Sequence, residues 1–106
     1  MTEYIQVVTT VETREQAEKI AEEVLGSRLA ACVQISRCHS RYRWQGTLEQ
    51  ADEYLCCMKS RRDLFEGLQI LIRGQHPYDV PEILAIPVVE GNKEYLAWLE
   101  KELLPG

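Results

Sequence analysis

The most constraining feature of this sequence is a pair of long strand patterns joined by one short turn. Residues 29–44 alternate between two faces, and residues 47–59 form a second run of strand-forming residues. Gln45-Gly46 lies between them and predicts a two-residue turn, because glycine adopts a positive φ without strain. Each arm spans about 13–16 residues, whereas strands of globular domains usually span about 3–10. We therefore expect one hairpin, Leu29 to Lys59, that is too long for a single small domain to bury.

One face of the first arm changes character halfway along its length. Its odd positions are apolar at first and basic afterwards: Leu29, Ala31, Val33 and Ile35, then Arg37, His39, Arg41 and Arg43. The apolar half belongs against a core, whereas the basic half projects beyond it. Bare projecting strands promote aggregation, so we expect neighbouring subunits to cover them in a homo-oligomer. A solvated arm without a partner is the alternative, but Tyr42 and Trp44 near the tip need a surface on which to pack.

The turn also predicts the register of the hairpin. If Trp44 lies opposite Thr47 and no bulge intervenes, the direct partners are Arg37–Tyr54, Ile35–Cys56, Val33–Met58 and His39–Asp52.

The segment before the hairpin predicts a strand followed by a helix. Residues 4–11 are apolar and β-branched, which is typical of a strand. Thr13 and Gln16 form a capping box, and Gly26 stands where a C′ glycine belongs. The apolar positions between them follow helical spacing: Ala17, Ile20, Ala21, Val24 and Leu25.

The segment after the hairpin predicts a helix, a strand and a last helix. We expect Ser60 to cap the first of these helices and Gly74 to end it, with Leu64, Leu68, Leu71 and Ile72 on its apolar face. Residues 83–89 are nearly all apolar, which favours a short central strand that ends or bulges at Pro87. Asn92 is the expected N-cap of the last helix.

This order of elements indicates the fold class. It is α+β and ferredoxin-like, βαββαβ, with a long central hairpin and an extra C-terminal helix. Both crossover helices should lie on one face of a four-stranded sheet. Residues 1–106 contain no linker, repeat or low-complexity segment, so we expect a single domain.

Charge and composition exclude several classes of function. The net charge of −5 argues against nucleic acid as the main partner. The N-terminus has no secretory signal pattern, and no apolar run is long enough to cross a bilayer. We therefore expect a cytoplasmic protein with no membrane partner. The four cysteines form no CxxC pair and are expected to be free thiols: Cys32, Cys38, Cys56 and Cys57.

The motifs of common enzyme classes are absent from the sequence, so we expect no catalytic residues and no enzyme activity. His76, which Pro77 and Tyr78 follow in a loop, is the main candidate metal ligand, although a hydrogen-bonding or surface histidine is the commoner case. The cysteines read as small buried hydrophobes, with a Cu(I) site across subunits as the alternative. The basic stripe of Arg37, Arg41 and Arg43 favours a charge lattice between subunits over a site for an anion or nucleic acid.

Blocks of residues along nearly the whole chain stand in the order and spacing of a known family. They are Ala30-Ala31-Cys32-Val33-Gln34-Ile35, Tyr42-x-Trp44-x-Gly46, Lys59, His76-Pro77-Tyr78-x-x-Pro81-Glu82-Ile83, Pro87, Gly91 and Tyr95-Leu96-x-Trp98-Leu99. This set resembles the CutA family of divalent cation tolerance proteins. The resemblance implies a ferredoxin-like fold, an interlocked homotrimer, a role in tolerance of metal ions, copper especially, and no settled catalytic activity. It also implies an architecture similar to the PII signalling proteins.

The resemblance further implies where ligands bind. Some bacterial members are credited with a copper site that uses a first-strand cysteine and adjacent histidines before the proline. Here Thr9 and Gln75 occupy two of those positions, which leaves His76 as the expected metal ligand. No cofactor is required, and the expected ligands are copper, another divalent cation or a small anion. The expected ligand-binding residues, in the cleft between subunits, are Trp44, Lys59, Tyr78, Glu82 and Trp98. The alternative function is a non-enzymatic, PII-like sensor module for a small ligand or a protein partner.

Overall fold

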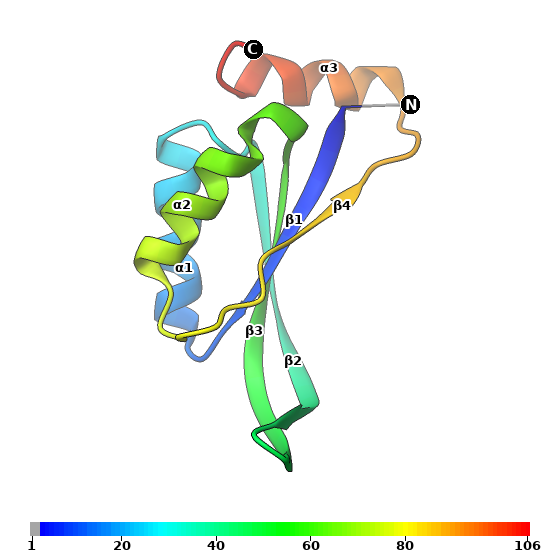
Figure 1. Cartoon of the computed structure of the whole chain (residues 1–106). Helices are drawn as coiled ribbons and strands as arrows, with labels where there is room; N and C mark the ends of the chain where they lie inside the picture. Colours follow the sequence, from blue (N-terminus) through cyan, green and yellow to red (C-terminus); the bar gives the residue numbers. More distant parts are fainter. Residues whose placement is uncertain (1–2) are drawn as a thin grey trace.

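The computed structural model describes residues 3–106 and contains one antiparallel sheet in the order β2-β3-β1-β4 (Figure 1). The chain runs through β1 (Tyr4–Val11), α1 (Arg14–Gly26), β2 (Cys32–Trp44), β3 (Thr47–Arg61), a 3₁₀ turn (Arg62–Leu64), α2 (Phe65–Gln75), β4 (Leu84–Pro87) and α3 (Lys93–Glu102). Helices α1 and α2 lie side by side on one face of the sheet, and α3 lies at the end away from the hairpin tip (Figure 1). The predicted α+β, ferredoxin-like fold is confirmed.

The long hairpin has the predicted register along its whole length. Trp44 lies opposite Thr47, and each of the other four expected pairs is present. The turn needs two residues with positive φ, and Gln45 and Gly46 supply them at 50° and 83°. Such a turn matches the natural twist of the two strands. The short turn therefore holds strands of 13 and 15 residues in one alignment.

Helix α1 begins as predicted and ends differently. The Thr13–Gln16 capping box is present, with both reciprocal hydrogen bonds. Gly26, however, is the last helical residue, and the left-handed position falls on Arg28, whose φ is 60°. The Arg28 side chain donates to the carbonyls of Lys101 and Glu102 at the end of α3. This contact between distant segments holds a backbone conformation that is unfavourable for arginine.

The core fills the space between the sheet and the two helices. Strand β1 buries every second side chain, and the fully buried residues of β3, α1 and α2 face them: Val7, Thr9 and Val11 with Cys56 and Met58, Ile20 and Val24, and Leu68 and Ile72. Gly67 allows α2 to approach the hairpin base, because a Cβ there would lie 3.3 Å from Leu29 Cδ2. The apolar half of the hairpin thus belongs to this core, as its sequence predicted.

The start of α2 differs from the prediction. Ser60 does not cap the helix but lies buried in β3, where its hydroxyl donates to the Leu29 carbonyl at 2.6 Å. Arg62–Leu64 forms a 3₁₀ turn, and α2 begins after Leu64 without a side-chain cap. The helix also continues through Gly74 to Gln75. A serine before a helical pattern can thus belong to the preceding strand when a buried carbonyl needs its hydroxyl.

Strand β4 is an edge strand, so the prediction of a central strand was wrong. It contains only Leu84–Pro87, pairs only with β1, and exposes all four residues. Pro87 ends it, as expected. The apolar run therefore signals a surface that its own chain leaves uncovered rather than the middle of the sheet. Leu84 and Ile86 remain 55% and 46% exposed.

Candidate functional site

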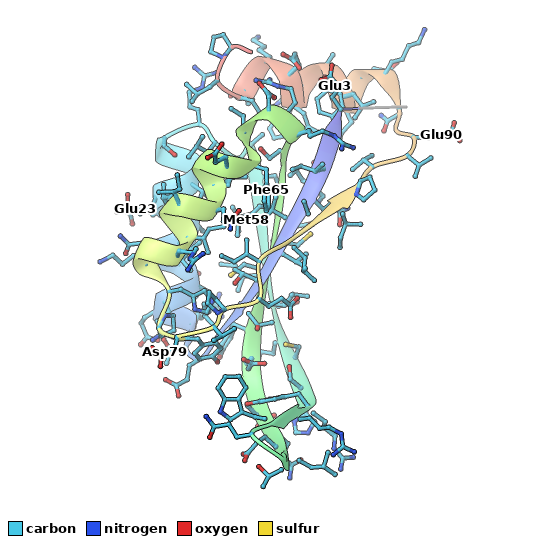
Figure 2. The ribbon with its side chains drawn as sticks, in the orientation of Figure 1. Glu3, Glu23, Met58, Phe65, Asp79 and Glu90 are labelled. Atoms are coloured by element: carbon cyan, nitrogen blue, oxygen red, sulfur yellow. The ribbon has the colours of Figure 1, made fainter. Side chains whose placement is uncertain are left out.

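The loop of residues 76–83, which contains Asp79, connects α2 to β4 (Figure 2). Side chains of its first residues form hydrogen bonds with β1 and β3. His76 directly follows α2 as its C-cap, and its backbone is extended, as expected of a residue before proline. Its Nε2 lies 3.0 Å from Thr9 Oγ1 in β1, and its Nδ1 accepts a hydrogen bond from the Tyr78 backbone N–H at 3.1 Å. Because Nδ1 accepts, a neutral ring carries its proton on Nε2 and donates it to Thr9.

The surroundings of His76 favour the neutral ring. Burial lowers the pKa of His76, and this effect outweighs the Thr10 carbonyl and the Glu53 carboxylate, which favour the charged form. A proton on Nδ1 would also face the Tyr78 N–H, which is itself a donor. Both ring nitrogens are therefore engaged within the chain.

Tyr78 ties the same loop to the root of the projecting hairpin. Its hydroxyl donates to Glu53 Oε2 at 2.7 Å, and its ring lies 5.0 Å from the His76 ring, measured between centroids. Burial, followed by the hydrogen bond to Glu53, raises the pKa of Tyr78 strongly. Glu53 is only 6% exposed, and no lysine or arginine forms an ion pair with it among residues 3–106. The loop thus covers a buried carboxylate that has no cationic partner in the described part of the chain.

The residues around His76 do not fit a copper centre within one subunit. Among the described residues, no group of three or more histidine, cysteine, aspartate or glutamate side chains could hold a metal ion. The side chain within hydrogen-bond distance of Nε2 belongs to Thr9, and its hydroxyl is a poor ligand for copper. His76 therefore offers one imidazole donor, and only after losing its hydrogen bond to Thr9.

The other predicted ligand-binding residues do not gather at one place in a single chain. Trp44 stands at the hairpin tip opposite Thr47, whereas Lys59 lies at the base opposite Cys32 and donates to Gln34 Oε1 at 2.6 Å. Trp98 lies on α3 beside Tyr95, with ring centroids 5.6 Å apart. Only Tyr78 and the exposed Glu82 share the loop with His76. A pocket that contained the whole set would need residues from more than one chain.

The sequence did not single out Glu53, and it placed Thr9 only at a ligand position of the family, not as a partner of His76. Thr9 contacts a residue 67 positions away, and Glu53 contacts one 25 positions away. Neither spacing follows a helix or strand period. The one sequence signal for Glu53 is its place in the second arm of the hairpin, at the point where the apolar half of that arm begins.

The cysteines are free, as predicted, and they occupy different surroundings. Cys56 is fully buried, and burial raises the pKa of its thiol to about 11, so it behaves as a small hydrophobe. Cys57 donates to Gln6 Oε1 at 3.4 Å. Cys32 lies close to Tyr95, whose pKa is raised mainly by burial and also by this thiol.

Comparisons with known proteins agree on one family. Residues 5–102 match the family model described as CutA1 divalent ion tolerance protein. The chain is 44% identical over 96 residues to the divalent-cation tolerance protein CutA of Thermus thermophilus, covering 90% of this chain and 93% of the relative. It is 42% identical over 101 residues to CutA of Yersinia pestis, covering 94% and 85%.

Solved structures extend the same likeness to three dimensions. The crystal structure of CutA1 from Oryza sativa superposes with a TM-score of 0.93 at 35% identity, covering 97% of this chain and 95% of that one. The divalent cation tolerance protein of Thermus thermophilus gives 0.91 at 42% identity, covering 94% and 98%. Within residues 3–106, no helix is both long and apolar enough to cross a bilayer.

Proposed function

Because the chain belongs to the CutA1 divalent ion tolerance family, we propose that it acts in tolerance of divalent metal ions as a cytoplasmic homotrimer without catalytic activity. The observation that carries this proposal is the family match over residues 5–102. The absence of common enzyme motifs from the sequence supports a non-enzymatic role. The four free thiols support a reducing compartment such as the cytoplasm.

The uncovered surfaces of the sheet support the homotrimer. Strands β2 and β4 form its two edges. Large apolar side chains stand exposed on the hairpin tip, β4 and α3: Tyr42, Trp44, Leu84, Ile86, Tyr95 and Trp98. Edges and apolar patches of this kind call for a protein partner. A ring of copies would cover both edges of every subunit.

We propose that a metal ion binds to His76 together with ligands from another subunit. The test is a calorimetric Cu(II) titration of the intact oligomer and of His76→Ala. If His76 is a ligand, the variant should bind Cu(II) about tenfold or more weakly, because the loss of residues that only orient a ligand already costs that much. Equal affinity in the two proteins would remove His76 from any metal site. Thr9→Val is the matched control, since it keeps the imidazole and frees its Nε2 from the hydroxyl.

The second candidate function is a sensor or interaction module that binds a small ligand or a protein between subunits. The observation that favours it is the buried Glu53–Tyr78 pair under the 76–83 loop, for which residues 3–106 supply no ion-pairing cation. Native mass spectrometry of the purified oligomer tests this candidate by detecting a bound small molecule. A mass equal to that of the bare chains in the purified oligomer, together with a Cu(II) affinity that depends on His76 in the titration, would favour the first candidate.

A further inference from the structure

The projecting half of the hairpin is a ribbon with two chemically different faces. Directly opposed residues of an antiparallel pair share a face, so the register assigns every side chain. The basic face carries Arg37, Arg41 and Arg43, opposite Tyr54, Gln50 and Leu48. The other face, here called the acidic–aromatic face, pairs Cys38 with Glu53, Tyr42 with Glu49 and Trp44 with Thr47.

The basic face holds three cations that have no counterion among the described residues of their own chain. Arg37, Arg41 and Arg43 are exposed, and none of them forms an ion pair among residues 3–106. The one carboxylate on this face, Asp52, is engaged by His39, with Nδ1 and Oδ1 2.8 Å apart. The stripe is therefore strongly positive on a chain whose net charge is −5.

The acidic–aromatic face has the opposite deficiency. Glu53 is buried and receives the Tyr78 hydroxyl, but no cation of its own chain balances it among the described residues. Glu12 and Tyr42 also act on the Tyr78 hydroxyl, so a second carboxylate and a second phenol lie near it. A buried carboxylate is costly unless an opposite charge and hydrogen-bond donors compensate it.

We propose that the basic face of one copy docks on the acidic–aromatic face of the next, where an arginine completes the Glu53–Tyr78 site. This inference rests on the proposed homotrimer and adds which faces meet and in which direction. A guanidinium suits the position, because it binds a carboxylate through two parallel hydrogen bonds and stacks on aromatic rings. Tyr42 and Trp44, each nearly half exposed, offer such rings.

The two-faced ribbon also excludes one mode of association. A twofold dimer stacked through the ribbon would place like faces in contact, basic on basic or acidic–aromatic on acidic–aromatic, and would leave both charge excesses unpaired. Contact between unlike faces leaves one basic and one acidic–aromatic face free after each step. Such an interface is satisfied at every subunit only when the copies close into a ring.

The experiment compares charge reversal on the ribbon with charge reversal elsewhere. Arg41→Glu/Arg43→Glu changes two exposed residues of the basic face, and Arg62→Glu/Arg73→Glu changes two exposed arginines outside it. Sedimentation velocity over a concentration series gives the assembly constant, and circular dichroism checks the fold. We expect assembly to weaken about tenfold or more in the ribbon variant and much less in the control.

Glu53→Gln supplies the second half of the test, because the amide oxygen still accepts from Tyr78 while the charge is lost. The combined variant carries Glu53→Gln together with Arg41→Glu/Arg43→Glu. If an arginine of the stripe binds Glu53, the assembly constant of the combined variant should fall by less than the product of the two separate fold-losses. The docking would be overturned if the ribbon variant formed trimers with an unchanged assembly constant, or if the losses of the two variants simply multiplied. The homotrimer itself would still stand after either result. A monomeric wild-type protein at micromolar concentration would instead overturn the homotrimer and the docking together.

Discussion

The base and the tip of the long hairpin are built from the same two strands but differ in what covers them. At the base, Val33 and Ile35 pair with Met58 and Cys56 beneath α1 and α2. At the tip, which projects away from the helices (Figure 1), every residue from 41 to 50 is exposed. The pairing is equally regular in both halves. Strand pairing here therefore follows from the turn and the alternation, whereas burial follows from the neighbouring elements.

Replacing Met58 at the base should give the largest effect. Met58→Ala removes a fully buried side chain that faces α1 and α2. We expect the free energy of unfolding to fall by about 2–5 kcal/mol, because the loss of apolar burial adds to the cost of a cavity. Urea denaturation of the variant and the wild type measures this difference.

Leu48→Ala is the matched control at the tip, where the leucine is 71% exposed. Apart from any contact between subunits, this change should alter the free energy of unfolding of a subunit by no more than about 0.5 kcal/mol. Equal losses in the two variants would contradict the division of the hairpin into a covered base and an uncovered tip.

Tyr78→Phe acts at the boundary between the two halves, where the 76–83 loop meets Glu53. The change removes the 2.7 Å hydrogen bond and leaves the buried carboxylate without that donor. We expect a loss of about 1–3 kcal/mol in unfolding free energy. Hydrogen exchange should localise it, with faster exchange of the loop amides than in wild type. A stability equal to that of the wild type would mean that water replaces the hydroxyl without cost.

The smallest effect is expected from the exposed His39–Asp52 pair near the tip. The hydrogen bond that the His39 ring donates to the Asp52 carboxylate raises the pKa of His39, so the folded pKa lies above the unfolded value of about 6.5. The pair therefore stabilises the fold fully below that unfolded value, and its contribution is lost as the pH rises through the folded pKa. In Asp52→Asn, an NMR titration should find the pKa of His39 lowered toward its ordinary value. An unchanged pKa would show that the contact is not maintained in solution.

The sequence was sufficient to predict the elements whose signals are local. The Gln45-Gly46 turn and the alternation of β2 specified the register, and Thr13 with Gln16 specified the start of α1. The wrong prediction of a central strand has a different cause. Residues 83–89 read as central because an apolar run indicates burial without indicating which chain provides the cover.

The candidate site was less predictable than the fold. His76 was identified through its proline context, but its partners Thr9 and Glu53 come from β1 and β3, which no spacing rule connects to it. The left-handed position at Arg28 rather than Gly26 depends likewise on a distant contact, with the end of α3. Such contacts follow from tertiary packing, and a local pattern contains no record of them.

The unbroken register of the hairpin restricts how its length can change during evolution. One residue inserted into a single arm would turn every following side chain to the opposite face, exchanging arginines with aromatic residues at the tip and core with surface at the base. Tolerated changes therefore add or remove two residues on each arm at a time. The reach of the hairpin accordingly varies in discrete increments of about 6.8 Å, twice the rise per residue of an antiparallel strand.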